Sequence, residues 1–184
     1  MDKAAVNYVA QRQDPLRKRY LERPAEAQIV DHARADSMGS DPFHGTAVVG
    51  DAHFPLNFGI HRAVGGDHDL CNPGDILCAA LAACLDSTLR LIAVRMGVTL
   101  EALDVEVSAF ADVRGCLMVA RDVPSGFQRI DVDVRIKAGE GVDPASIGML
   151  TAAAERCCVI LQTLRSDIPV QTRFNESTAH TATV

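Results

Sequence analysis

NPGDILCAALAACLDSTLRLIAVRMG, residues 72–97, is the stretch of sequence that decides the fold. Asn72 can cap a helix that begins at the following proline, and Asp75 adds a negative charge to the first turn, where the helix dipole favours it. Residues 76–85 carry no charge at all, so no face of this half can be turned to water at low cost. Gly97 is a natural left-handed stop. The stretch therefore predicts a buried central helix whose second half reaches the surface.

Cys84 lies in the middle of this predicted helix, beside small alanines that would let another side chain approach its sulfur. The start of the helix is about 15 Å away at 1.5 Å per residue, too far for the helix dipole to acidify the thiol. A reactive Cys84 would therefore need a cation from elsewhere to stabilise its thiolate. The alternative is that Cys84 is a small apolar side chain in a core.

Composition narrows the class of protein. A chain of 184 residues fits one domain with an N-terminal arm, and with no Trp its core must be built from Ala, Val, Leu and Ile. The net charge of −6, without basic runs, argues against nucleic acid as a partner. We expect no membrane-spanning segment and no signal peptide, which predicts a soluble, cytoplasmic protein. In that compartment six cysteines indicate reduced thiols rather than structural disulfides.

The pattern along the chain predicts an α+β fold with helices packed on mostly antiparallel sheets. We expect an N-terminal helical arm (1–24), a single domain (25–174) and a flexible tail (175–184). In the arm, a short helix should follow Asp14-Pro15 and stop before Pro24. A second long helix should run from Asp143-Pro144 to about Arg165. Strands are predicted at 27–37, 44–49, 54–62, 103–110, 130–137 and 168–174.

Three segments together resemble the OsmC/Ohr family, the osmotically inducible protein C-like and organic hydroperoxide resistance proteins. They are the helix sequence 72–97, GFQRIDVDV at 126–134 and AERCCVILQTL at 154–164. The similarity covers roughly residues 65–174, and the arm resembles a less-studied OsmC-like branch. The resemblance implies an OsmC-like fold, in which two long central helices are enclosed by sheets of an intertwined homodimer with active sites at the subunit interface.

The resemblance also implies a thiol peroxidase that reduces organic hydroperoxides and is itself reduced by an external thiol or dithiol. The peroxidatic cysteine of the family matches Cys84, and the second-helix cysteine matches Cys158, which would resolve the oxidised Cys84 as a disulfide. For the family's active-site arginine, Arg34 is the first choice and Arg62 the second. Neither a cofactor nor a metal is expected.

Departures from the family pattern keep alternatives open. The well-characterised peroxidases have an acidic residue directly after Asn-Pro, where this chain has Gly74. Asp75 comes next but should lie on the helix face opposite Cys84. The proline that usually follows the second cysteine is Val159 here. One alternative is a non-catalytic OsmC-like dimer that binds an apolar small molecule at its interface. Another is acyl transfer through a Cys84 thioester, for which no histidine base is matched.

The remaining chemistry-bearing side chains show no ligand spacing. The histidines of the N-terminal third lack the strict spacing of a metal site and are interpreted as loop residues. The other cysteines are interpreted as packing residues or spare thiols without an evident role. These two sets are His32, His44, His53, His61 and His68, and Cys71, Cys78, Cys116 and Cys157.

Overall fold

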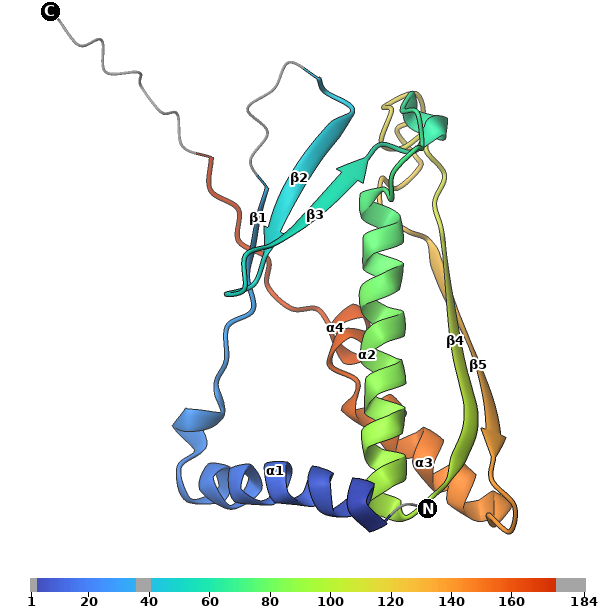
Figure 1. The fold of residues 1–184 in the computed structure, drawn as a ribbon. Coiled ribbons are helices and arrows are strands. Elements are labelled where there is room, and N and C mark those ends of the chain that lie inside the picture. Colours follow the sequence, from blue (N-terminus) through green and yellow to red (C-terminus); the bar gives the residue numbers. More distant parts are fainter. Residues whose placement is uncertain (1–2, 36–40, 175–184) are drawn as a thin grey trace, which may run out of the picture.

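The computed structural model describes residues 3–35 and 41–174 and has the predicted α+β architecture (Figure 1). A long central helix stands between a two-stranded antiparallel sheet and a three-stranded antiparallel sheet. In chain order the elements are α1 (Lys3–Glu22), η1 (Pro24–Ala27), β1 (Ala33–Ala35), β2 (His44–Val49), β3 (Phe54–Gly59), η2 (Arg62–Val64), α2 (Pro73–Met96), β4 (Leu100–Phe110), β5 (Arg129–Ala138), α3 (Pro144–Cys157) and α4 (Val159–Leu164).

The central helix α2 begins and ends where its sequence predicts. The Asn72 side chain accepts from the Gly74 N–H at 2.8 Å, and Asp75 Oδ2 accepts from the Asn72 N–H at 3.0 Å, which makes a capping box. Gly97 ends the helix with a left-handed φ of 75°. Every fourth residue then forms one buried row that faces β4 and α3: Leu81, Leu85, Leu89 and Ala93.

By length and composition alone α2 could also cross a membrane, a test that the core helix of a soluble protein passes as well. The physical reason for its apolar composition lies in the fold. The helix runs through the middle of the molecule, and its buried row belongs to the one hydrophobic core of the described chain.

The sheet of β4 and β5 confirms both predicted strands and their antiparallel pairing, with Val105 opposite Val134. Alternate side chains of the two strands pack against the α2 core, while charged side chains such as Asp104 and Arg135 lie on the outer face. The other sheet has the order β1-β2-β3 and confirms the strand at 44–49. The predicted strand at 27–37 is much shorter, Ala33–Ala35, and its last two residues lie outside the described part.

The three-stranded sheet is attached to the rest of the chain mainly through the segment that precedes α2. The Gly59 N–H donates to the Cys71 carbonyl at 3.0 Å at the end of β3. His44, at the start of β2, bonds Asp41 at 2.7 Å and Asp69 at 3.0 Å. These hydrogen bonds raise the pKa of His44 to about 9. The sheet and the β4–β5 pair thus stand on different sides of α2 (Figure 1).

Two predicted elements at the ends of the chain need correction. The arm is not a short helix after Pro15 but a 20-residue helix that includes it. Arg95 of α2 stabilises this placement by an ion pair with Asp14 at 2.9 Å and a hydrogen bond to Gln13 at 3.2 Å. Residues 168–174 form no strand in the described chain, because no neighbouring strand offers them a ladder.

Candidate active site

The second cysteine helix is broken, where the sequence predicted a continuous helix to about Arg165. Helices α3 and α4 meet at Cys158, whose ψ of 108° is extended rather than helical. The N–H of Cys158 still donates to the Ala154 carbonyl at 2.9 Å, but its carbonyl already starts α4 by accepting from the Gln162 N–H at 3.0 Å. The first N–H groups of α4 therefore have no carbonyl partner in their own helix.

The break brings the two predicted thiols together. Cys84 lies on α2 and is partly buried, and the Cys158 side chain is fully buried in the core between α2 and α3. The two thiols lie near enough that each is among the groups that shift the pKa of the other. Two sulfurs that are 74 positions apart in the chain are thus neighbours through the contact of α2 with α4.

Backbone N–H groups favour the thiolate form of Cys84. Burial raises the pKa of Cys84, but the N–H of Ile160, the thiol of Cys158, the N–H of Val159 and the hydroxyl of Thr88 together lower it below its ordinary value. The Thr88 hydroxyl has one proton, and it donates this proton to the Cys84 carbonyl at 2.7 Å, so we give its contribution to the sulfur little weight. The sequence analysis expected a cation to stabilise the Cys84 thiolate. The N–H groups at the start of α4 provide part of that stabilisation.

The pKa of Cys158 is shifted in the opposite direction. Burial raises the pKa of Cys158 most, and the N–H groups of Leu161 and Ile160 lower it, but the interaction with Cys84 and the negative charge there raise it, so that it lies above its ordinary value. A thiol that ionises readily therefore sits beside one that stays protonated. That arrangement suits a nucleophilic thiolate beside a second thiol that can later form a disulfide with it.

The two arginines proposed from the sequence lie elsewhere in the single chain. Arg34 is on β1, where it is opposite Val48 of β2, and Arg62 is in η2 before the central helix. Neither is among the groups that shift the pKa of Cys84. A single chain therefore brings together the two predicted sulfurs but not the predicted arginine.

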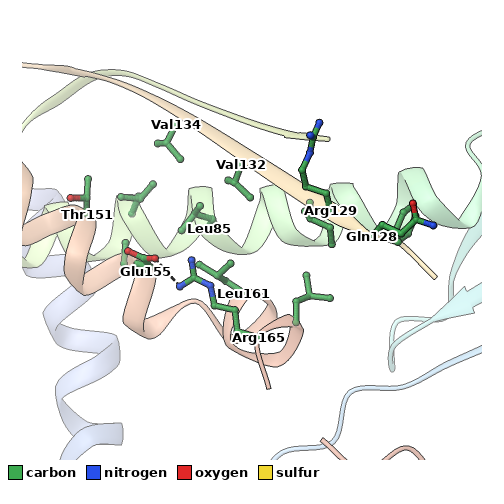
Figure 2. Close-up of a pocket in the computed structure, with 14 residues that line it drawn as sticks. Leu85, Gln128, Arg129, Val132, Val134, Thr151, Glu155, Leu161 and Arg165 are labelled. Atoms are coloured by element: carbon green, nitrogen blue, oxygen red, sulfur yellow. Dashed lines mark ion pairs between the residues drawn. The ribbon is translucent and has the colours of Figure 1, made fainter. Parts of the chain in front are cut away.

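A cavity of about 570 Å³ lies between β5 and the α3–α4 pair with α2 at its back (Figure 2), and Leu85, the neighbour of Cys84 in the chain, lines it although neither thiol does. Most of its wall is aliphatic. Polar side chains lie toward its two ends. Glu155 and Arg165 are among them and form an ion pair at 2.7 Å. Its lining residues include Leu85, Leu89, Phe127, Gln128, Arg129, Ile130, Val132, Val134, Thr151 and Leu161.

Residues 66–173 match the family profile described as OsmC-like protein, which is more than half of the chain. The chain belongs to the OsmC-like family.

Solved structures have the same fold as this OsmC-like protein. One is an OsmC-like protein of unknown function from Vibrio cholerae, with a TM-score of 0.61 and 11% identity over 74% of this chain and 94% of that one. Another is an OsmC-like protein from Mycoplasma pneumoniae, with a TM-score of 0.60 and 19% identity over 75% and 89% of the two chains. A third is an organic hydroperoxide resistance protein from Legionella pneumophila, with a TM-score of 0.56 and 21% identity over 76% and 91%. No curated protein has a matching sequence.

Phe127 explains why this OsmC-like protein has a glycine after Asn-Pro. A Cβ atom on Gly74 would lie 3.1 Å from the Phe127 ring and 2.9 Å from Asn72 Oδ1. Any side chain at position 74 would therefore require the Phe127 ring, which lines the cavity, and the Asn72 amide to shift. Asp75 does not take the place of the family's acidic residue, because its carboxylate accepts hydrogen bonds from the backbone N–H and the side-chain amide of Asn72 in the helix cap.

The start of α4 is the part of the site that the sequence analysis missed. Its donors are backbone atoms, which no side-chain motif marks. One signal was available, because a family proline after Cys158 indicates a helix break: the residue before a proline disfavours the helical conformation. Val159 retains that break and keeps its N–H group.

The other candidate ligands and thiols do not join this site. In the part of the chain that the structure describes, no three His, Cys, Asp or Glu side chains are grouped to hold a metal ion. The Cys71 thiol donates to the Asn57 carbonyl at 3.5 Å and the Cys116 thiol to the Val113 carbonyl at 3.2 Å. Both make local backbone contacts only.

Proposed function

We propose that this OsmC-like protein is a cysteine-dependent organic hydroperoxide reductase. The observation that carries the proposal is the pair of adjacent thiols, one on α2 and one at the start of α4, whose pKa values are shifted in opposite directions. Cys84 would be the nucleophile because its thiolate is the favoured one. Cys158 would be the resolving thiol because it stays protonated beside it.

The reaction would proceed in three balanced steps. The Cys84 thiolate attacks the terminal oxygen of R–O–OH, the O–O bond breaks, and the alkoxide leaves as the alcohol after taking a proton. Cys84 is then a sulfenic acid, two electrons more oxidised. The Cys158 sulfur attacks the Cys84 sulfur, so that a disulfide forms and water leaves. An external thiol or dithiol returns two electrons and restores both thiols.

The cavity supports an organic substrate rather than hydrogen peroxide. Its volume of about 570 Å³ and its aliphatic wall would bury an apolar R group. Leu161, three residues after Cys158, is one of its lining residues. Several structures with the same fold carry the description organic hydroperoxide resistance protein, from Legionella pneumophila and from Elizabethkingia anophelis among others.

We further propose that the working unit is an intertwined homodimer in the cytoplasm. One chain exposes 14104 Å², whereas a compact protein of 19.7 kDa exposes about 8,600 Å². If the residues that the structure does not describe are counted as fully exposed, they account for only about 2,600 Å² of the excess in exposed surface. On α2 the uncharged first half still exposes Ala79, Ala80 and Ala83, which a second copy could cover. In this dimer the partner's three-stranded sheet would bring an arginine, with Arg34 the first candidate, to the thiols.

The proposal is tested by the fate of the thiols. Reduced protein is mixed with one equivalent of cumene hydroperoxide, and the six cysteines are mapped by mass spectrometry. We expect a Cys84–Cys158 disulfide in the wild type. In Cys158→Ser, Cys84 should accumulate as a sulfenic acid that dimedone traps.

Cys84→Ser is the matched control, and it should leave the peroxide unconsumed and Cys158 reduced. Peroxide consumption that persists in Cys84→Ser, or a wild type whose thiols stay unchanged, would overturn the peroxidase. Arg34→Gln should slow the reaction with peroxide more than it slows alkylation of Cys84, and equal effects on both would remove Arg34 from the site.

The cavity also favours a second candidate, a non-catalytic dimer that binds an apolar small molecule. Gly74 is consistent with this alternative, since the space for an acidic side chain is filled by Phe127. Saturable binding of an apolar fluorescent probe, with all six thiols unchanged by peroxide, would support it over the enzyme.

A further inference from the structure

The break between α3 and α4 leaves one carbonyl to be satisfied. In a continuous helix the carbonyl of Glu155 would accept from the N–H of Val159, four residues on. The extended backbone at Cys158 turns that N–H away. The carbonyl instead accepts from Nε2 of Gln162 at 2.8 Å. A side-chain amide thus stands where the backbone donor of the next turn would have been.

We infer that Gln162 is a positioning residue for the active-site thiol. Its amide replaces the Val159 N–H as the donor to the Glu155 carbonyl. This leaves the first N–H groups of α4 free to face the Cys84 sulfur. If the amide were absent, the unpaired carbonyl would compete for the Val159 N–H, and the break at Cys158 would tend to close into a continuous helix.

A second link across the break holds the same two segments. The carboxylate of Glu155 pairs with the guanidinium of Arg165 at 2.7 Å, so both the backbone and the side chain of one α3 residue are tied to α4 or its end. Both partners are more than half exposed, at 55% and 54%, and the ion pair alone adds little free energy. Its geometric effect is to keep α4 folded back toward α3, where the amide of Gln162 reaches the carbonyl.

This inference deepens the proposed function, but its test does not depend on peroxide. Cys84 is alkylated with iodoacetamide from about pH 5 to about pH 10, and modification of the Cys84 peptide is followed by mass spectrometry. Gln162→Met keeps the length of the side chain and removes the donor. Ser166→Ala is the control, because that hydroxyl also donates to a backbone carbonyl, of Thr163 at 3.1 Å, at the far end of α4 from the break.

We expect Gln162→Met to slow alkylation of Cys84 at pH 7 by about three- to tenfold, the usual worth of one hydrogen bond. At pH values where Cys84 is fully ionised, the rate should equal that of the wild type. Ser166→Ala should match the wild type throughout. A loosened structure would instead raise the rate at every pH by exposing the thiol. An unchanged pH profile in Gln162→Met, or an equal shift in Ser166→Ala, would overturn the inference.

Failure of the peroxidase and failure of this inference give different results. A wild type that alkylates readily at pH 7 but forms no disulfide with cumene hydroperoxide would remove the peroxidase alone. A wild type that forms the disulfide, together with a Gln162→Met variant whose profile is unshifted, would remove the positioning role alone.

Discussion

At the scale of single residues, the roles of the two cysteines follow from their surroundings rather than from their chemistry. Both are thiols in the same apolar contact, and burial raises the pKa of each. N–H groups of α4 lower the pKa of both, and the two differ in that the thiol of Cys158 also lowers the pKa of Cys84, while the charge on Cys84 raises that of Cys158. Their neighbours thus decide which of the two sulfurs ionises.

Val159 offers a test of these donors, because a proline there removes one N–H and little else. The position is the first of α4, where proline fits, and the preceding residue already has the extended backbone that proline requires. The Val159 side chain is 68% exposed, so little packing is lost. We expect Val159→Pro to raise the pKa of Cys84 and to slow its alkylation at pH 7 by about two- to fivefold.

Val159→Ala is the control for this substitution, because it truncates the side chain and keeps the N–H. Its pH profile of alkylation should match the wild type. If the proline and alanine variants had the same profile, the Val159 N–H would have no part in stabilising the thiolate.

A substitution of Asp75 tests whether this residue only caps α2 or also acts on the Cys84 thiol. Its carboxylate accepts from the backbone and side-chain N–H groups of Asn72. Asp75→Ala should therefore lower the free energy of unfolding by about 0.5–1.5 kcal/mol, measured by urea denaturation. The pH profile of Cys84 alkylation should not change. A shifted profile would show that Asp75 acts on the thiol.

At the scale of elements, the helices and strands with a strong period or a cap were predictable, and those that depend on distant partners were not. Alternation in β4 and β5, and the cap and glycine of α2, located those elements within a few residues. Cys84 and Cys158 were found through the family resemblance. The break at Cys158 could not be found from periodicity, because apolar residues continue through it on the helical stripe. The donors at the start of α4 therefore stayed hidden.

The link between β2 and the segment before α2 should depend on pH. The pKa of His44 is raised to about 9 by its hydrogen bonds to Asp41 and Asp69, so the link is fully present below the ordinary value of 6.5 and is lost as the pH rises through 9. We expect His44→Gln to lower the melting temperature at pH 6 and to have little effect at pH 10. A nuclear magnetic resonance titration of His44 with a midpoint near 6.5 would contradict this.

At the scale of the whole molecule, a single chain leaves strand edges unpaired and apolar side chains exposed. The sheets of β1–β3 and β4–β5 both have free edges, and in the described chain neither edge of the longer pair is covered by another strand. Long unpaired strands are uncommon in isolated proteins because they invite pairing with another chain. The extended residues 168–174, with alternate apolar side chains exposed, would gain a ladder in the same way.

The dimer is tested by mass in solution. Size-exclusion chromatography with light scattering should give twice the chain mass of 19.7 kDa, and the value should not fall on tenfold dilution. A single species at the chain mass would contradict the dimer and would leave the thiols without an arginine from a partner.

The six-residue helix α4 has a consequence for the reductant. Once the two sulfurs were joined, the anion that faces its first N–H groups would be gone, and so short a helix has little stability of its own. The oxidised protein should then exchange the amide hydrogens of residues 159–164 faster than the reduced one. A reducing partner could thus distinguish oxidised molecules from reduced ones by an unfolded turn at α4, next to the disulfide that it reduces.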